Sequence, residues 1–178
     1  MGHREIALLA GPDSSVSAKL RLKSWLETLE GYGLKPVTVL HGNWDAQSGY
    51  AGALQMLRET PNFSAVLVGN DQMALGVLSA FHQHQVAVPG EKSVIGYDDT
   101  YESSFFYPAL STVSLDLDLQ GKEAVRRILA STSGAPHTSS TLPARLVIRH
   151  SSGARIEQGK DLQAIAEQLR AIAHRLAP

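Results

Sequence analysis

The sequence predicts an α/β protein built on a doubly wound parallel sheet. Short apolar runs end in glycine or in polar residues, and segments with helical spacing of apolar residues separate them. Strands that alternate with helices in this way form parallel βαβ units. Residues 94–99 (VIGYDD) add a third observation, because two carboxylates follow a β-branched run where a buried strand should stop. Ligands of open parallel sheets bind beyond such strand ends.

The repeating part of the chain supplies four expected strands and three expected helices. Each strand is a short apolar run, and each helix starts near a residue that accepts backbone N–H bonds, such as Ser15, Asp45 or Asn70. Gly31 and Gly33 are typical of the end of the first helix. The expected strands are 6–11, 36–40, 65–69 and 93–96, and the expected helices are 15–31, 45–60 and 71–81.

After Thr100 the pattern changes. An irregular aromatic turn over 102–108 precedes a strand at 110–115 and a helix at 119–129. A connector at 131–140, rich in Ser, Thr, Gly and Pro, leads to a strand at 142–148 and a linker at 151–153. The last predicted helix runs from 160 to 176, and its apolar residues repeat differently from those of the other helices.

Composition excludes several classes of protein. The formal charge of −1 comes without a dense Lys/Arg stripe, so this chain by itself is a poor DNA-binding surface. Cysteine is absent, which excludes disulfides and thiolate chemistry and suits a cytoplasmic protein. No apolar run reaches the roughly 18 residues of a membrane helix. Because the chain starts almost directly on a predicted strand, we expect it to be part of a longer protein.

Polar and aromatic side chains follow each of the first four strands and should meet at one edge of the sheet. Ser17 and Arg21 share a helix face, since they are four residues apart. An arginine fork, an amide and a carboxylate together supply donors and acceptors for vicinal hydroxyls, and an indole offers a flat apolar surface to a sugar ring. The pattern indicates a carbohydrate site. The residues at the strand ends are Ser14, Ser15, Trp44, Asn70, Asp71, Asp98 and Asp99.

Each of these side chains also has an ordinary structural interpretation. Asn70, Asp98 and Asp99 suit helix or turn capping, because their oxygens accept backbone N–H bonds. Trp44 alone suits packing, and Arg21 alone suits a surface ion pair. Their convergence at one edge is what favours a binding site.

Motifs of catalysis are absent from the sequence. No Gly-Lys-Ser/Thr follows residues 11–15, and neither G-x-G-x-x-G after the first strand nor G-x-S-x-G occurs. His82 and His84, two apart on a helix, point to different faces and make poor metal ligands. Ser17 has no neighbouring histidine, and Asp98 with Asp99 lacks further carboxylates for Mg²⁺. We therefore expect no enzyme activity and no cofactor.

Four stretches resemble the lac/galactose repressor family of bacterial transcription regulators. They are residues 6–12 (IALLAGP), 14–22 (SSVSAKLRL), 70–76 (NDQMALG) and 96–100 (GYDDT), and the similarity extends over nearly the whole chain. Members of that family join an N-terminal helix-turn-helix to a two-lobed, periplasmic-binding-protein-like (type I) sensor. The resemblance implies that this chain is the second lobe with a C-terminal tail, and that the DNA-binding headpiece and the first lobe lie outside it.

The resemblance also implies particular residues. The positions that match the family's sugar site are Ser15, Ser17, Arg21, Trp44, Asn70 and Asp98, and the matches that hold sugar hydroxyls are Arg21, Asn70 and Asp98. Where matching sugar sites carry a glutamine and a phenylalanine against the effector, this sequence has Leu115 and Leu117. A galactoside-like effector is the expectation, and the two leucines alter the polarity and shape of its site.

Two further segments are expected to form contacts between copies of the chain. Apolar residues after Asn70 and in the aromatic turn predict a dimer surface, which matches the family's dimer contact; they are Leu75, Leu78, Phe105 and Phe106. The tail repeats leucine and isoleucine every seven residues, which is typical of a coiled coil. This repeat predicts a tetramer formed through Leu162, Ile165, Leu169, Ile172 and Leu176.

These observations favour the effector-sensing lobe of a sugar-responsive repressor, which reaches operator DNA only through the absent headpiece. The expected parts are a lobe at 1–116, a segment at 117–142 that crosses to the first lobe, a return strand and linker at 143–158, and an oligomerisation helix at 159–178. One alternative is a transport-type sugar-binding protein of the same fold, which would need an export signal. Another is a small α/β hydrolase or phosphatase that uses Asp98.

Overall fold

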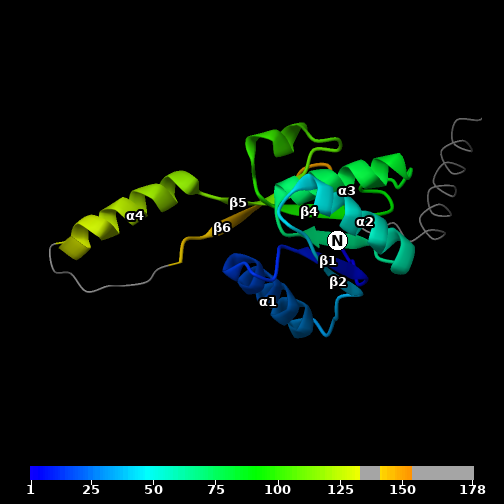
Figure 1. Ribbon diagram of the computed structural model, residues 1–178, viewed down its shortest axis with the longest axis horizontal. Coiled ribbons are helices and arrows are strands. Elements are labelled where there is room, and N and C mark those ends of the chain that lie inside the picture. The colour runs from blue at the N-terminus through cyan, green and yellow to red at the C-terminus, as the bar shows by residue number, and fades with distance from the viewer. Residues whose placement is uncertain (133–140, 154–178) are drawn as a thin grey trace, which may run out of the picture.

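The computed structural model describes residues 1–132 and 141–153, which form one six-stranded sheet with helices on both faces (Figure 1). The strands lie in the order β2-β1-β3-β4-β5-β6. Their bounds are β1 Ile6–Ala10, β2 Thr38–His41, β3 Ala65–Val68, β4 Ser93–Asp98, β5 Ser111–Leu115 and β6 Ala144–Val147. The helices are α1 Val16–Gly31, α2 Ala46–Glu59, α3 Asp71–Gln83 and α4 Leu117–Thr132, and a 3-10 turn, η1, spans Tyr101–Phe105.

The first four strands are parallel, as the alternating pattern predicts, and β5 also runs parallel to β4. The chain steps from β1 out to β2 and then reverses across β1 to β3 and β4. Because such crossovers are right-handed, the reversal places α1 on one face and α2 with α3 on the other (Figure 1). The carboxyl ends of β1, β3 and β4 therefore meet at one edge of the sheet.

The sheet is mostly parallel, as predicted, and its last strand makes it mixed. β6 pairs antiparallel with β5, and the register places Leu115 opposite Ala144. The chain leaves the sheet after β5, forms α4 away from it, and then returns from the opposite direction (Figure 1). α4 begins two residues earlier than predicted, because the Asp116 carboxylate accepts the Leu119 N–H at 2.8 Å and so starts the helix.

The core lies between the sheet and the pair α2 and α3. The largest fully buried side chains of this core are Phe63, Phe81, Leu9, Met56 and Met73. By contrast, α1 buries only Ala18 and Leu29, and Val16 and Leu20 are exposed. One face of the lobe is thus densely packed and the other is thinly covered.

The predicted dimer residues do not all lie on the surface. Leu78 is 3% exposed and belongs to the core, because α3 is covered by α2 on one side and by the sheet on the other. Phe106 is half-buried and packs against the same core. Leu75 and Phe105 remain exposed, together with Tyr101 and Tyr107.

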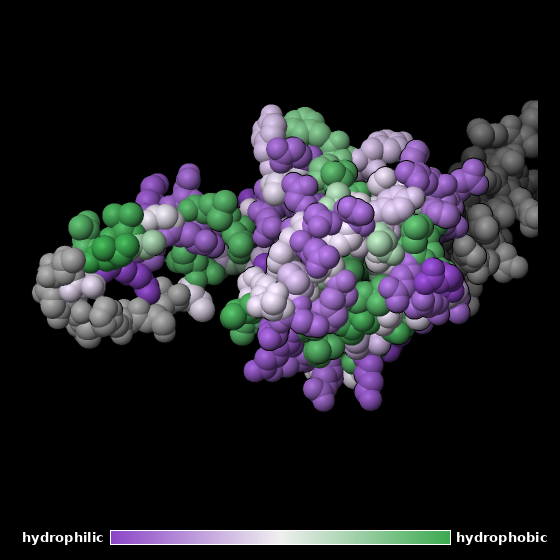
Figure 2. Space-filling model, in the orientation of Figure 1, coloured by the Kyte–Doolittle hydropathy of each residue, from purple (hydrophilic) through white to green (hydrophobic). Residues whose placement is uncertain are grey.

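α4 projects from the sheet without covering it (Figure 1). Figure 2 shows hydrophobic surface gathered along this helix, where Val125 and Ile128 are 58% and 65% exposed. None of the described helices is long and apolar enough to cross a membrane. The heptad tail at 159–178 lies outside the described residues, so its prediction stays a prediction.

Candidate functional site

The predicted sugar-site residues meet at the carboxyl edge of β1, β3 and β4. Arg21 lies in α1, which follows β1, and Ser15 caps that helix. Asn70 stands between β3 and α3. Trp44 precedes α2, and Asp98 is the last residue of β4. Parallel strands bring these segments together at the place where open sheets bind ligands.

Arg21 is the best-connected member of this cluster. Its guanidinium donates a hydrogen bond to the Gly69 carbonyl at the end of β3. The guanidinium carbon lies 3.4 Å from the centroid of the Tyr97 ring and 5.7 Å from that of the Trp44 ring. Stacking on an aromatic face holds the planar group in place while its remaining N–H donors stay available. Arg21 is therefore a fixed donor group beside Asp98 and not a surface ion pair.

Trp44 is held in a strained backbone conformation at the edge of the sheet. Its φ of 70° is in the left-handed region, which costs about 1–3 kcal/mol for a residue other than glycine. The indole covers the end of β1 so closely that a Cβ on Gly11 would overlap it. The Asn70 side chain donates to the Trp44 carbonyl at 2.9 Å, which secures this conformation. Strain of this kind is concentrated at ligand sites.

Asn70 and Ser15 carry out the capping roles that their types suggest. The Asn70 Oδ1 accepts the Met73 N–H at 2.9 Å and caps α3, and Ser15 Oγ accepts the Ala18 N–H at 3.3 Å and caps α1. Ser17 lies 3.0 Å from Ser15, oxygen to oxygen, on the same exposed turn. The bonds of Asn70 to Met73 and Trp44 use one of its two N–H groups and one of its two acceptor positions, so capping and ligand binding are compatible.

The two adjacent carboxylates at the end of β4 have different environments. Asp99 receives a 2.7 Å bond from Arg149, which follows β6. Burial acts to raise the pKa of Asp99, but hydrogen bonds from Arg149 and Ser114 outweigh it and hold that pKa below its usual range. Asp99 is thus a structural anion.

Asp98 makes no side-chain hydrogen bond within the described part of the chain. Burial raises its pKa, the nearby Arg21 cation opposes this rise, and the negative charge of Asp71 adds to it. Both Asp98 and Asp99 have positive φ, 117° and 57°, so the backbone here is strained at two consecutive residues. Asp98 is therefore an acceptor that the fold leaves available for a ligand.

Asp98 lines a pocket of about 640 Å³ where the chain leaves and re-enters the sheet. Leu115, Leu117 and Arg145 contribute to its walls, so the two leucines noted in the sequence lie beside the candidate acceptor. Among the described residues, no three His, Cys, Asp or Glu side chains gather as a metal site.

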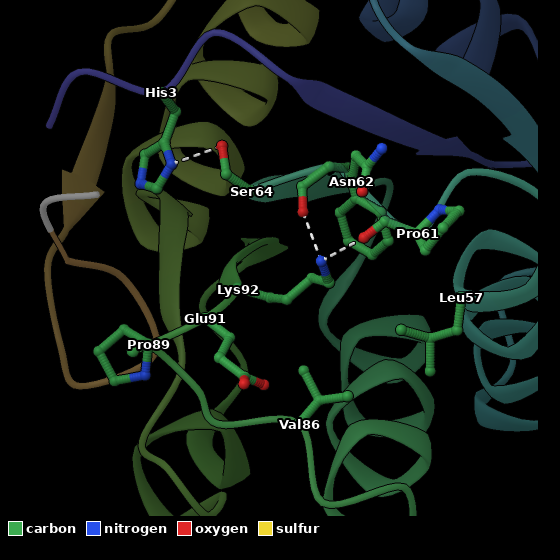
Figure 3. A pocket seen from close by; sticks show the side chains of 11 residues that line it. His3, Leu57, Pro61, Asn62, Ser64, Val86, Pro89, Glu91 and Lys92 are labelled. Carbon is green, nitrogen blue, oxygen red and sulfur yellow. Dashed lines mark hydrogen bonds between the residues drawn. The ribbon is translucent and has the colours of Figure 1, made fainter. Parts of the chain in front are cut away.

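A second pocket, of about 420 Å³, lies at the opposite, amino edge of the strands (Figure 3). Lys92 extends beneath it and donates to the Pro61 and Phe63 carbonyls at 2.7 and 2.5 Å, with its ammonium 4.2 Å from the centroid of the Phe63 ring. Burial lowers the pKa of Lys92. Because the lysine already binds two carbonyl oxygens there, this pocket is a structural junction and is separate from the predicted site.

Two residues of the site, Tyr97 and Arg149, were not assigned from the sequence. Tyr97 lies within the recognised stretch, but only its stacking under Arg21 reveals a role. Arg149 is fifty positions from Asp99, and nothing in the local pattern links the two. The sequence places Asp71 among the strand-end residues of the predicted site, but the structure buries it fully and turns it toward β5.

Comparisons with known proteins agree with this arrangement. A family model described as periplasmic binding protein-like domain matches residues 1–152. Lactose operon repressors of Klebsiella pneumoniae and Escherichia coli K12 are 46% and 40% identical over 178 residues, which is 99% of this chain in both cases. The match covers 50% and 49% of those proteins, so the chain spans about half the length of the curated relatives it matches.

Solved structures give the same result. A lac repressor dimer bound to operator and the anti-inducer ONPF is 44% identical with a TM-score of 0.83, over 86% of this chain and 54% of that chain. A lac repressor bound to ONPG is 43% identical with a TM-score of 0.82, over 85% of this chain and 46% of that chain. The chain thus belongs to the periplasmic-binding-protein-like family, within its LacI-type regulators, and is the C-terminal part of their effector domain.

Proposed function

We propose that this chain is the effector-sensing lobe of a sugar-responsive transcriptional repressor. The observation that carries the proposal is the cluster at the sheet edge, where Arg21, fixed by Tyr97, stands beside the unbonded carboxylate of Asp98. Relatives of the same fold have been solved with ONPF and ONPG. Nothing in this arrangement resembles a catalytic nucleophile paired with a base.

The proposed ligand is a galactoside-like sugar. Asp98 would accept one or two sugar hydroxyls, while Arg21 and Asn70 would donate to others, and the Trp44 indole would face the apolar side of the ring. Leu115 and Leu117 line the pocket next to Asp98 without offering a hydrogen bond. We therefore expect the part of the effector that reaches this wall to be apolar.

Effector binding would act on DNA through parts of the protein beyond this lobe. We propose that residues 117–142 belong to a first lobe, to which the chain crosses after β5 and from which it returns as β6. The exposed apolar side chains of α4, such as Val125 and Ile128, support this, because a helix rarely leaves such a stripe in water. A ligand between the lobes would shift the population of their arrangements and so lower operator affinity, in the cytoplasm.

The binding proposal is tested by Asp98→Ala in a protein that also carries the first lobe. Losing one hydrogen bond to a charged acceptor costs about 1.5–3 kcal/mol, so galactoside affinity should fall by about tenfold or more in calorimetry. The stability of the fold should not decrease. When folding raises the pKa of a carboxyl, the folded protein loses stability as pH rises through that pKa. Asp98→Ala should therefore leave the melting temperature at neutral pH equal or higher.

Glu59→Ala is the matched control, because Glu59 is an exposed acid at the end of α2, away from the cluster. It should bind galactoside as the wild type does. Equal affinity in the Asp98→Ala and Glu59→Ala proteins would refute the assignment of Asp98. Galactoside binding that leaves operator affinity unchanged would favour the transport-type alternative, since only a repressor couples the two.

We also propose that the lobe dimerises through the exposed aromatic surface of η1 and α3. Leu75, Phe105 and Tyr107 are 38%, 71% and 86% exposed, and large exposed apolar groups that gather in this way usually mark an interface. Phe105→Asp should therefore halve the mass seen by light scattering. Tyr32→Asp, a substitution of an exposed aromatic at the far end of α1, should leave the mass unchanged. Equal masses for the two variants would exclude this surface.

The heptad tail is proposed to join two dimers into a tetramer. Its leucines and isoleucines repeat every seven residues, and a helix of this length needs partners to persist. Two solved lac repressors that are dimers carry C-terminal deletions, which supports the same role here. Removal of residues 160–178 should convert a tetramer into a dimer in analytical ultracentrifugation. If the truncated protein stays tetrameric, another surface must join the two dimers.

A further inference from the structure

Asp71 is a fully buried carboxylate in the first turn of α3, and none of the ion pairs within residues 1–132 and 141–153 includes it. Its Oδ1 accepts the Thr112 hydroxyl at 2.6 Å, and its Oδ2 accepts the Thr100 N–H at 2.9 Å. Burial raises the pKa of Asp71 although hydrogen bonds from Thr112, Thr100 and Tyr97 oppose the rise. A buried charge without a cation is costly, so packing alone does not account for this residue.

The bonds of Asp71 reach the segment that carries Asp98. Asp98 and Asp99 have φ values of 117° and 57°, which side chains with a Cβ rarely adopt, so neighbours must hold them there. Arg149 holds Asp99 from the side of β6. Asp71 holds Thr100, the next residue, from the side of α3.

The carboxylate of Asp71 is itself fixed on all sides. A Cβ on Gly96 would overlap its Oδ1, so the backbone of β4 lies directly against it. Thr112 fixes the same oxygen from β5, and the positive end of α3 favours a negative charge at this position. The group is a rigid anchor between α3, β4 and β5.

We propose that Asp71 is a positioning residue for the effector: its buried carboxylate, bonded to the Thr100 N–H and the Thr112 hydroxyl, holds residues 98 and 99 in the left-handed conformation that presents Asp98 to the ligand. This inference rests on the proposed role of Asp98. Asp71 is fully buried and does not touch the ligand; it acts through Asp98.

The test uses amide NMR of the chain itself. The Thr100 amide proton, bonded to a carboxylate, should resonate downfield, exchange slowly, and move upfield as acid protonates Asp71. The positive φ of residues 98 and 99 should give each a strong intraresidue HN–Hα cross-peak. In Asp71→Asn the fold should persist, because an amide oxygen can accept the Thr100 N–H, but the acid titration of the Thr100 amide should vanish.

Asp71→Ala should abolish the downfield shift and slow exchange at Thr100. In a protein that also carries the first lobe, it should weaken binding of methyl β-galactoside in calorimetry by about tenfold or more. Asp71→Asn should restore binding to within about threefold of the wild type, since a neutral acceptor loses only part of the bond. Val66→Ala, a buried core truncation in β3, controls for lost stability. It should lower the melting temperature, but the amide shift and exchange of Thr100 and the galactoside affinity should stay unchanged.

Two results would overturn the inference. One is a Thr100 titration that persists in Asp71→Asn, which would then belong to Asp98 or Asp99, the carboxylates that Arg21 and Arg149 face. The other is wild-type galactoside affinity in a folded Asp71→Ala protein. If the wild-type protein that also carries the first lobe binds no galactoside, the proposed ligand fails, while the Thr100 amide and the cross-peaks of residues 98 and 99 still decide whether Asp71 positions the loop.

Discussion

Gly76→Ala is expected to lower the free energy of unfolding by about 3 kcal/mol. Gly76 lies in the middle of α3 where it crosses α2, and a Cβ there would overlap the carbonyl oxygen of Ala46 at the start of α2. The Cβ would also overlap the backbone nitrogen of Tyr50. Both obstructing atoms belong to the backbone of α2, so no side chain can rotate away. The two helices must separate and lose core contacts. For a chain of this size the melting temperature should fall by roughly 6–12 °C.

Gly121→Ala is the matched control, because it makes the same substitution inside a helix. Apart from its chain neighbours and the backbone of α4 itself, no atom lies within 4 Å of a Cβ at Gly121. Alanine there gains helix propensity, so the free energy of unfolding should stay equal or rise by up to about 1 kcal/mol. Circular dichroism of both variants during thermal unfolding gives the comparison. Equal melting temperatures would mean that the α2–α3 crossing adjusts more freely than its geometry indicates.

Local patterns predict most of this fold. The apolar runs identify the six strands, and the residues expected to start helices do so: Asp45 accepts the Ser48 N–H at 2.7 Å, and Ser15 and Asn70 accept equivalent bonds. These interactions join residues three apart, so their signal lies within a few positions of the sequence. The convergence of Arg21, Trp44, Asn70 and Asp98 follows from strand order, which the βαβ pattern also indicates.

Interactions between distant segments are what the patterns leave out. Leu78 has the spacing of an exposed stripe, but α3 is covered on two sides, so its apolar residues are buried over most of the circumference. The direction of β6 depends on the path of α4 outside the sheet. The Asp71–Thr112 and Asp99–Arg149 bonds join residues 41 and 50 positions apart. Only the folded chain brings these groups together.

Arg21→Met is expected to weaken galactoside binding by about tenfold or more, since it removes charge-assisted hydrogen bonds worth about 1.5–3 kcal/mol. Methionine keeps much of the apolar contact with Tyr97, so the fold should persist. Arg21→Lys keeps the cation but loses the planar guanidinium, whose carbon lies 3.4 Å from the Tyr97 ring centroid. Its loss of galactoside affinity should therefore be intermediate.

The pH dependence distinguishes a direct role of Arg21 from a general loss of fit. Sugar hydroxyls bind the ionised form of Asp98, so affinity should fall as pH falls through the pKa of that carboxyl. Burial raises this pKa and Arg21 partly lowers it, so Arg21→Met should raise it further and move the acid limb of binding to higher pH. Arg21→Lys retains the charge and should leave the limb near its wild-type position. Calorimetric titrations of the three proteins across acid pH measure this limb, and an unshifted limb in Arg21→Met would show that Arg21 does not act on Asp98.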